Sequence, residues 1–177
     1  SMSKKILIVG GVAGGATAAA RLRRLDENSH IVIFERGEYI SFANCGLPYY
    51  VGGTIREKGD LLVQTVEGLS KRYNLDIRIK TEVLSIDRQN KTVQAKDLAT
   101  GTVYRENYDY LLLSPGASPI IPPIEGVRNN PKVFTLRTVG DAESIVNCIR
   151  QDNAQKAVVV GGGFIGLEMA ENLKERN

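Results

Sequence analysis

One cysteine, Cys45, lies in the run SFANCGLPYY at Ser41–Tyr50, and the only other cysteine of the chain is Cys148. Proteins that use an internal dithiol carry two cysteines a few residues apart, as in Cys-x-x-Cys. A redox-active Cys45 must therefore cycle through a sulfenic acid or through a mixed disulfide with an external thiol. The alternative is a buried, unreactive cysteine. Cys148 lies on an apolar helix face, and we expect it to pack in the core.

The residues after Cys45 predict a short helical turn over Gly46–Val51, with Pro48 near its start and Gly52-Gly53 at its end. A thiol at the N-terminus of a helix has a lowered pKa and is a better thiolate. Taken without further information, these residues fit a reactive Cys45 and a buried, inert one equally well. In a reactive site, Asn44 would orient the thiolate or its partner.

A glycine-rich turn precedes the cysteine segment and indicates a dinucleotide site. It runs from Gly10 to Gly15, between a buried strand at 6–9 and an alanine-rich helix that continues to about Leu25. Val12 stands where the pattern Gly-x-Gly-x-x-Gly has its middle glycine, so the first turn departs from the pattern at one position.

A carboxylate follows this turn at the distance that a ribose site requires. Glu35 ends the next buried strand, 31–34, about 20 residues after the turn, where a carboxylate accepts hydrogen bonds from a ribose diol. The turn, helix and second strand together form a βαβ unit. Taken alone, Glu35 fits a solvated strand end equally well, but the turn before it favours ribose binding.

A second turn fits the complete pattern at Gly161, Gly163 and Gly166, after a predicted strand at 157–160 and before a helix from Leu167 onward. Phosphates bind such turns because the free N–H groups and the dipole of the helix N-terminus favour anions. The alternative is a glycine-rich packing turn. Two turns of this kind imply two dinucleotides, a flavin and a nicotinamide, and the sequence leaves NADH and NADPH equally open.

The remaining elements complete a fold of the α/β class. They are a helix at 66–73, β-meander strands at 82–87 and 91–95 around a turn at 89–90, a buried strand at 110–113, a proline-rich connector at 115–127 and a helix at 139–150. We predict a Rossmann-like FAD-binding domain with an inserted β-meander, followed by the start of a second Rossmann-like domain that binds NAD(P).

The predicted domains are the FAD-binding lobe at 1–120, a connector at 121–137 and the beginning of the NAD(P)-binding domain at 138–177. One strand and one helix cannot bury their apolar faces alone, so we expect a fragment of a longer flavoprotein.

The composition excludes several classes of protein. With 42% hydrophobic and 24% charged residues the chain has an ordinary globular composition, and its net charge of +3 is too small to indicate nucleic acid. No apolar stretch approaches the roughly 18 residues of a membrane span. Two distant cysteines form no disulfide framework, so we expect a cytoplasmic protein. No metal site is predicted.

Four segments give the chain a family resemblance: the cysteine run at 41–49, YDYLLLSPGA at 108–117, FTLR at 134–137 and GLE at 166–168. They resemble the flavin-dependent pyridine nucleotide–disulfide oxidoreductases. The cysteine run is similar to the single-cysteine branch and, within it, to the coenzyme A-disulfide reductases. The resemblance covers the whole chain and implies FAD and NADH or NADPH as cofactors. It also implies electron flow from NAD(P)H through the flavin to a disulfide of Cys45.

The resemblance also implies roles for individual residues. Cys45 and Asn44 are implied to be catalytic. The implied substrate contacts are Thr17, Arg21, Arg24, Ser41 and Asn44. The cofactor-binding residues, those of the two turns included, are Gly10, Val12, Ala13, Gly14, Gly15, Glu35, Arg36, Val83, Ser114, Pro115, Gly116, Gly161, Gly163, Phe164, Ile165, Gly166 and Glu168. A homodimer is implied as well.

Three residues of the first helix, Thr17, Arg21 and Arg24, follow the spacing i, i+4, i+7 and share one face. Two guanidinium groups and a hydroxyl suit a multiply phosphorylated ligand such as coenzyme A. The other interpretation is a solvated face. Relatives that reduce peroxide or oxygen usually carry a histidine in the first glycine turn, where this chain has Ala13, and its one histidine, His30, lies elsewhere.

The sequence thus favours reduction of a coenzyme A disulfide, or of a coenzyme A persulfide or polysulfide. Two alternatives stay open. One is an NADH peroxidase or oxidase that works through a cysteine sulfenic acid. The other, from a different class, is a flavin-binding electron carrier or redox sensor in which Cys45 is passive.

Overall fold

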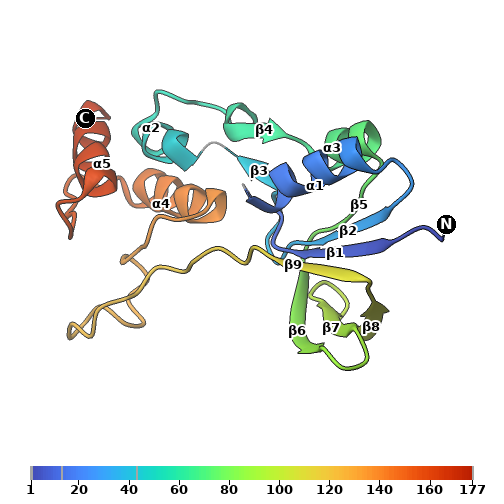
Figure 1. Cartoon of the computed structure of the whole chain (residues 1–177). Coiled ribbons are helices and arrows are strands. Elements are labelled where there is room, and N and C mark those ends of the chain that lie inside the picture. The colour runs from blue at the N-terminus through green and yellow to red at the C-terminus, as the bar shows by residue number, and fades with distance from the viewer. Residues whose placement is uncertain (1, 13, 43, 177) are drawn as a thin grey trace. The chain divides into compact units, whose positions relative to one another are not determined.

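The computed structural model describes residues 2–12, 14–42 and 44–176, with side chains left undescribed at Ser41, Phe42 and Asn44. The chain forms two compact units (Figure 1). The first comprises Ser1–Phe42 and Gln64–Gly116, and the second comprises Ala43–Val63 and Ala117–Asn177. The domain boundaries expected from the sequence stay a prediction.

The first unit is built on a parallel sheet of four strands in the order β5-β2-β1-β9. The strands are β1 (Lys5–Val9), β2 (His30–Phe34), β5 (Asp76–Arg78) and β9 (Tyr110–Leu113). Three of them confirm the predicted strands to within a residue. The fourth, β5, was not among the predicted strands; it pairs in parallel with β2.

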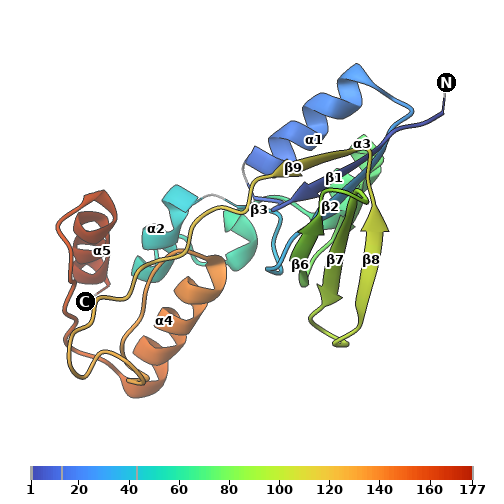
Figure 2. The same cartoon turned by 60° about the horizontal axis from the view of Figure 1, so that its bottom comes forward.

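Two layers cover this sheet (Figure 2). Helices α1 (Gly14–Leu25) and α3 (Val66–Tyr73) pack on the face that carries Ile6, Ile8, Ile31 and Ile33. The meander of β6 (Thr81–Asp87), β7 (Thr92–Asp97) and β8 (Val103–Asn107) packs on the face of Leu7, Val32 and Phe34. Successive side chains of a strand point to opposite faces, so an unbroken apolar run is needed where both faces are buried.

The last strand of the sheet is less buried than the sequence predicts. Among the described residues β9 pairs with β1 alone, so it is an edge strand. Tyr110 and Leu113 are accordingly 61% and 55% exposed. The apolar run predicts a buried strand, and its pattern is the same whether or not a further strand pairs with it.

The second unit is helical. It contains the 3₁₀ turns η1 (Asn44–Gly46) and η2 (Lys58–Leu61), and the helices α2 (Leu47–Gly52), α4 (Val139–Asp152) and α5 (Phe164–Glu175). Two short strands, β3 (Ser41–Phe42) and β4 (Leu62–Gln64), lie where the chain passes between the units. Thr138 and Asp141 form a capping box that starts α4, and no helix or strand occurs between β9 and α4.

The predicted strand at 157–160 is absent. These residues carry no regular structure, and Val158 and Val160 are 88% and 79% exposed. A strand needs a neighbouring strand for its N–H and C=O groups, and no described residue pairs with this segment. The following helix begins at Phe164, three residues before the predicted Leu167.

Two features are absent from the described residues. No helix there has both the length and the apolar character to cross a bilayer. No group of three or more His, Cys, Asp or Glu side chains there is arranged to hold a metal ion.

Candidate functional site

The first glycine turn lies at the carboxyl edge of the parallel sheet, and its geometry admits only glycine at two positions. Gly10 has a φ of +96°, and a Cβ at this residue would lie 1.9 Å from the carbonyl oxygen of Ser114. A Cβ at Gly15, in the first turn of α1, would lie 1.7 Å from the oxygen of Gly10. The absence of these Cβ atoms brings strand, turn and helix together, as a dinucleotide turn requires.

The segment after β9 lies beside this turn. Ser114 donates its backbone N–H to Val9 O at 2.8 Å, and a Cβ at Gly14 would lie 2.8 Å from Ser114 Oγ. Gly116 has a φ of +73°. The predicted flavin residues Ser114, Pro115 and Gly116 thus follow the strand adjacent to the turn, although more than ninety residues separate them from Gly14 in the sequence.

Glu35 is fixed against the turn by two backbone hydrogen bonds. Its Oε1 accepts from Gly11 N at 2.9 Å, and its Oε2 accepts from Gly37 N at 2.6 Å. The side chain is half-buried. Each carboxylate oxygen has a second acceptor site, so the group can still accept hydrogen bonds from a diol. The residues present therefore fit the nucleoside end of a dinucleotide whose phosphates lie at the N-terminus of α1.

Backbone bonds tie β5 and the start of β6 to the residues around Glu35. The N–H of Glu35 donates to Arg78 O at 2.9 Å, and Thr81 donates to Glu35 O at 2.9 Å. The register of β6 against β7 shifts between Val83 and Ser85. Arg36 is exposed and lies 3.9 Å from the carboxylate of Glu82. The two remaining flavin predictions, Arg36 and Val83, thus lie on segments that border Glu35.

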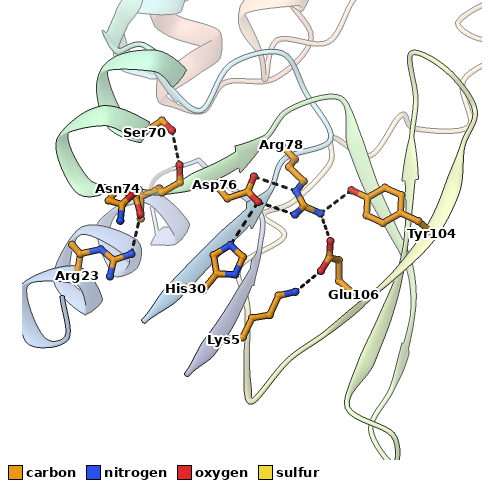
Figure 3. A network of polar contacts seen from close by, with 10 residues as sticks. Lys5, Arg23, His30, Ser70, Asn74, Asp76, Arg78, Tyr104 and Glu106 are labelled. Carbon is orange, nitrogen blue, oxygen red and sulfur yellow. Dashed lines mark hydrogen bonds and ion pairs between the residues drawn. The ribbon is translucent and has the colours of Figure 1, made fainter. Parts of the chain in front are cut away.

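An ionic network that the sequence analysis missed connects the sheet with the meander (Figure 3). Arg78 of β5 donates to Asp76 at 2.7 Å, to Glu106 of β8 at 2.5 Å and to the hydroxyl of Tyr104 at 3.2 Å. Lys5 of β1 donates to the second oxygen of Glu106 at 2.5 Å. Residues distant in the sequence form this network, and no local spacing in the sequence could have revealed it.

The network changes the acidity of its members. The hydrogen bond from Arg78 lowers the pKa of Asp76, although partial burial opposes it. Burial alone would raise the pKa of Glu106, but the hydrogen bonds from Lys5 and Arg78 outweigh it, and the pKa is lowered. The hydrogen bond to Asp76 raises the pKa of Arg78 above its ordinary value. All three groups are therefore charged at neutral pH.

The predicted stripe on α1 is present as an exposed face. Thr17, Arg21 and Arg24 are all exposed. Arg23, which lies off the stripe, has a structural role instead, since it donates to the carbonyl oxygens of Tyr73 and Ser29 at 2.8 and 2.7 Å. On this helix, Arg23 is therefore bound to the end of α3, while Arg21 and Arg24 are exposed to solvent.

Cys45 is exposed and lies in η1, two residues before α2. The predicted helical turn is confirmed: Pro48 lies in its first turn, and Gly53 ends it with a φ of +87°. Two residues of this short helix, Leu47 and Val51, are buried, with 3% and 0% of their surface exposed. Among the other predicted site residues, Ala13 lies outside the described residues, as do the side chains of Ser41 and Asn44.

Cys148 differs from Cys45 in its surroundings. It is half-buried on α4, rather than in the core as predicted, and its Sγ donates to Asp152 Oδ2 at 3.6 Å. Burial and the neighbouring Asp152 carboxylate raise the pKa of the Cys148 thiol. A thiol with a raised pKa is a poor nucleophile at neutral pH, so Cys148 is suited to structure rather than to redox chemistry.

The second glycine turn reproduces the key contact of the first. Gly161 has a φ of +121°, and a Cβ at Gly166 would lie 2.0 Å from the oxygen of Gly161. Gly163 precedes the first residue of α5 in extended conformation, with no side chain capping the helix. Phe164 and Ile165 are exposed, and Glu168 is half-buried. The uncapped N-terminus of α5 fits a pyrophosphate.

The chain is similar to known proteins over nearly its whole length. Residues 4–177 match the family described as pyridine nucleotide-disulphide oxidoreductase. The coenzyme A disulfide reductase of Staphylococcus haemolyticus is 40% identical over 173 residues, which cover 98% of this chain and 38% of that protein. The chain thus spans less than two fifths of this curated relative.

Two solved structures are similar over nearly all of the chain. The reduced CoADR-RHD of Bacillus anthracis is 57% identical, with a TM-score of 0.96 over 99% of this chain and 32% of that one. The NAD-dependent persulfide reductase of A. fulgidus is 42% identical, with a TM-score of 0.90 over 97% of this chain and 32% of that one. The resemblance expected from the sequence is confirmed, and the chain belongs to the pyridine nucleotide-disulphide oxidoreductase family.

Proposed function

We propose that the protein is an NAD(P)H-dependent flavoprotein that reduces coenzyme A disulfide, or a coenzyme A persulfide, through Cys45. The observation that carries this proposal is the exposed, lone Cys45 in a chain with two dinucleotide turns. Its relatives include proteins named coenzyme A disulfide reductase and NAD-dependent persulfide reductase.

The first turn would hold FAD and the second NADH or NADPH. Gly10–Gly15 and the N-terminus of α1 would bind the flavin pyrophosphate, and Glu35 the ribose, which its two backbone hydrogen bonds already orient. Gly161–Gly166 would bind the nicotinamide pyrophosphate. The bound flavin would supply the transfer of two electrons from the nicotinamide to sulfur.

Cys45 would act by thiol–disulfide exchange. Its thiolate attacks one sulfur of the disulfide, forms a mixed disulfide and releases one coenzyme A thiolate. Two electrons then cleave the mixed disulfide, which restores the Cys45 thiolate and releases the second coenzyme A thiolate. Each thiolate that leaves takes up a proton, so one NAD(P)H and one proton yield two thiols from one disulfide.

The exposed stripe of Thr17, Arg21 and Arg24 would bind the phosphates of coenzyme A, with Ser41 and Asn44 contacting the substrate near the thiol. Guanidinium groups bind phosphate in a fork geometry that lysine does not offer. A homodimer in a reducing cytoplasm, which would keep Cys45 reduced, completes the proposal.

The test compares two cysteine variants of the full-length, FAD-loaded protein. Cys45→Ser should abolish NADH-dependent reduction of coenzyme A disulfide, while Cys148→Ser should leave it unchanged. Both variants should still reduce ferricyanide with NADH, because that reaction needs the flavin and no thiol. Wild-type levels of disulfide reduction by Cys45→Ser would refute the proposal. Faster turnover with hydrogen peroxide than with the disulfide would favour the sulfenic acid alternative instead.

A further inference from the structure

We propose that Gly52, Asn172 and Arg176 are positioning residues for Cys45, and that they tie the cysteine to the helix that opens at the second glycine turn. The inference rests on the proposed function, in which Cys45 reacts with the substrate. All of these residues lie in the second unit, and none belongs to either glycine turn.

Close contact joins the ends of two helices. A Cβ at Gly52, the last residue of α2, would lie 2.7 Å from Asn172 Cβ and 2.8 Å from the backbone oxygen of Asn172 on α5. Gly52 does not have a positive φ, so its backbone conformation would accept alanine. The glycine is therefore required by the approach of α5. Asn172 is 4% exposed and donates to Glu168 O at 2.8 Å, which fixes its side chain against its own helix.

A hydrogen bond reinforces this contact. Arg176, directly after α5, donates from Nη1 to the carbonyl oxygen of Val51 at 2.8 Å. This carbonyl is one of the last four of α2, which have no partner within the helix. A charged donor makes such a bond stronger than a neutral one. The guanidinium thus holds the C-terminal end of α2 in place of a further helical turn.

The short length of α2 makes these contacts decisive for Cys45. Six residues are too few for a helix to be stable alone, so the neighbours of α2 determine its direction. Cys45 precedes α2 by two residues and moves with it. The α5 helix has twelve residues, a length of about 18 Å, with the second turn at one end and Asn172 near the other. One rigid element therefore positions both the second glycine turn and the helix that directly follows the Cys45 segment.

The matched pair Gly52→Ala and Gly59→Ala tests this inference. Both residues lie in the second unit, but a Cβ at Gly59 meets nothing within 4 Å. In the full-length, FAD-loaded protein, Gly52→Ala should lower kcat for coenzyme A disulfide about tenfold, because a displaced reacting group loses its alignment. The shorter α2 should yield rather than α5, so the KM for NADH and the reduction of ferricyanide should not change. Gly59→Ala should match the wild type in kcat for the disulfide, in KM for NADH and in ferricyanide reduction.

A second substitution keeps the test independent of folding. Arg176→Gln removes the charge that holds Val51 O and should slow disulfide reduction severalfold, and Arg176→Lys should recover part of the rate. An unchanged kcat in both Gly52→Ala and Arg176→Gln would overturn the inference. An equal loss of disulfide and ferricyanide reduction would also overturn it, since the substitution would then impair the whole enzyme and not the placement of Cys45. Failure of the proposed function itself would be seen separately, as full activity of Cys45→Ser.

Discussion

The two glycine turns have the same local geometry in very different surroundings. In each, the first glycine has a positive φ, and a Cβ on the last glycine would lie within 2.0 Å of the first glycine's oxygen. A Cβ added to Gly10, however, would strike the backbone of Ser114, whereas a Cβ added to Gly161 would meet nothing within 4 Å beyond its chain neighbours. Six residues thus produce the turn, and what surrounds it comes from elsewhere in the chain.

The difference lies in the strand that precedes each turn. Strand β1 pairs on both sides and has three buried residues, while 157–160 pairs with no described residue and is exposed. Both segments are apolar runs of similar composition. The turn closes through a contact between two residues that are five positions apart, so it forms without a sheet. A parallel strand, in contrast, needs a neighbouring strand to pair with. The first turn is therefore part of a rigid layer, and the second depends on the helix that follows it.

The largest effect should come from adding a methyl group to the first glycine of each turn. Gly10→Ala combines a positive φ with a clash against backbone, so we expect a loss of at least about 3 kcal/mol in the free energy of unfolding. Gly161→Ala has the positive φ without the clash and should lose about 1–2 kcal/mol. Urea unfolding of both variants measures the difference. Equal losses would show that local strain, and not the neighbouring layer, governs both turns.

At the last glycine of each turn, the added methyl group would make the same close contact in both turns. The two substitutions should therefore differ in which cofactor they affect and not in the local strain. Gly15→Ala and Gly166→Ala each place a Cβ within 2.0 Å of a carbonyl oxygen of their own turn. We expect Gly15→Ala to abolish FAD retention, and Gly166→Ala to keep FAD while raising the Kd for NADH at least about tenfold. Flavin absorbance after gel filtration and titration with NADH separate the two outcomes. Loss of FAD from Gly166→Ala would contradict the assignment of the turns.

Local patterns predicted much of this molecule from the sequence. The bounds of α3 and the course of α2, with Pro48 at its start and Gly53 after its end, follow from side chains within a few residues of one another. The same holds for both turns and for the position of Glu35 after β2. These features depend on backbone preferences and strand periodicity, which a short segment contains in full.

Features that depend on distant partners could not be predicted in this way. The run at 157–160 is as apolar as β1, yet it forms no strand here, because pairing is decided by another segment. The network around Arg78 joins three strands, and its carboxylates look like ordinary strand-end charges in the sequence. The contact of Gly52 with Asn172 is of the same kind, since nothing near Gly52 in the sequence indicates α5.

A smaller effect should follow from loosening the layer behind the first turn. Arg78→Met removes the donor to Asp76 and Glu106, both partly exposed, and should cost about 2 kcal/mol in the free energy of unfolding. FAD affinity should fall as well: the backbone oxygen of residue 78 accepts the N–H of Glu35, so a β5 that has lost its side-chain anchors would hold Glu35 less firmly. The control is Lys58→Met, which loses a partly exposed ion pair with Glu143 in the second unit and should cost less than about 1 kcal/mol. An equal cost in both variants would argue against a special rigidity of the first layer.

The smallest effect should be the dependence of this layer on pH. The pKa values of Asp76 and Glu106 are lowered in the folded protein, so the stability that they contribute is fully present above their unfolded values near about 4. As the pH falls below that point, the unfolded chain binds protons first and this contribution is lost. The difference in unfolding free energy between the wild type and Arg78→Met should therefore be constant from about pH 7 to 5 and narrow below about pH 4. A difference that stays constant down to pH 2.5 would mean that Arg78 stabilises the layer through its stacking on Phe34 and Tyr104 rather than through its charge.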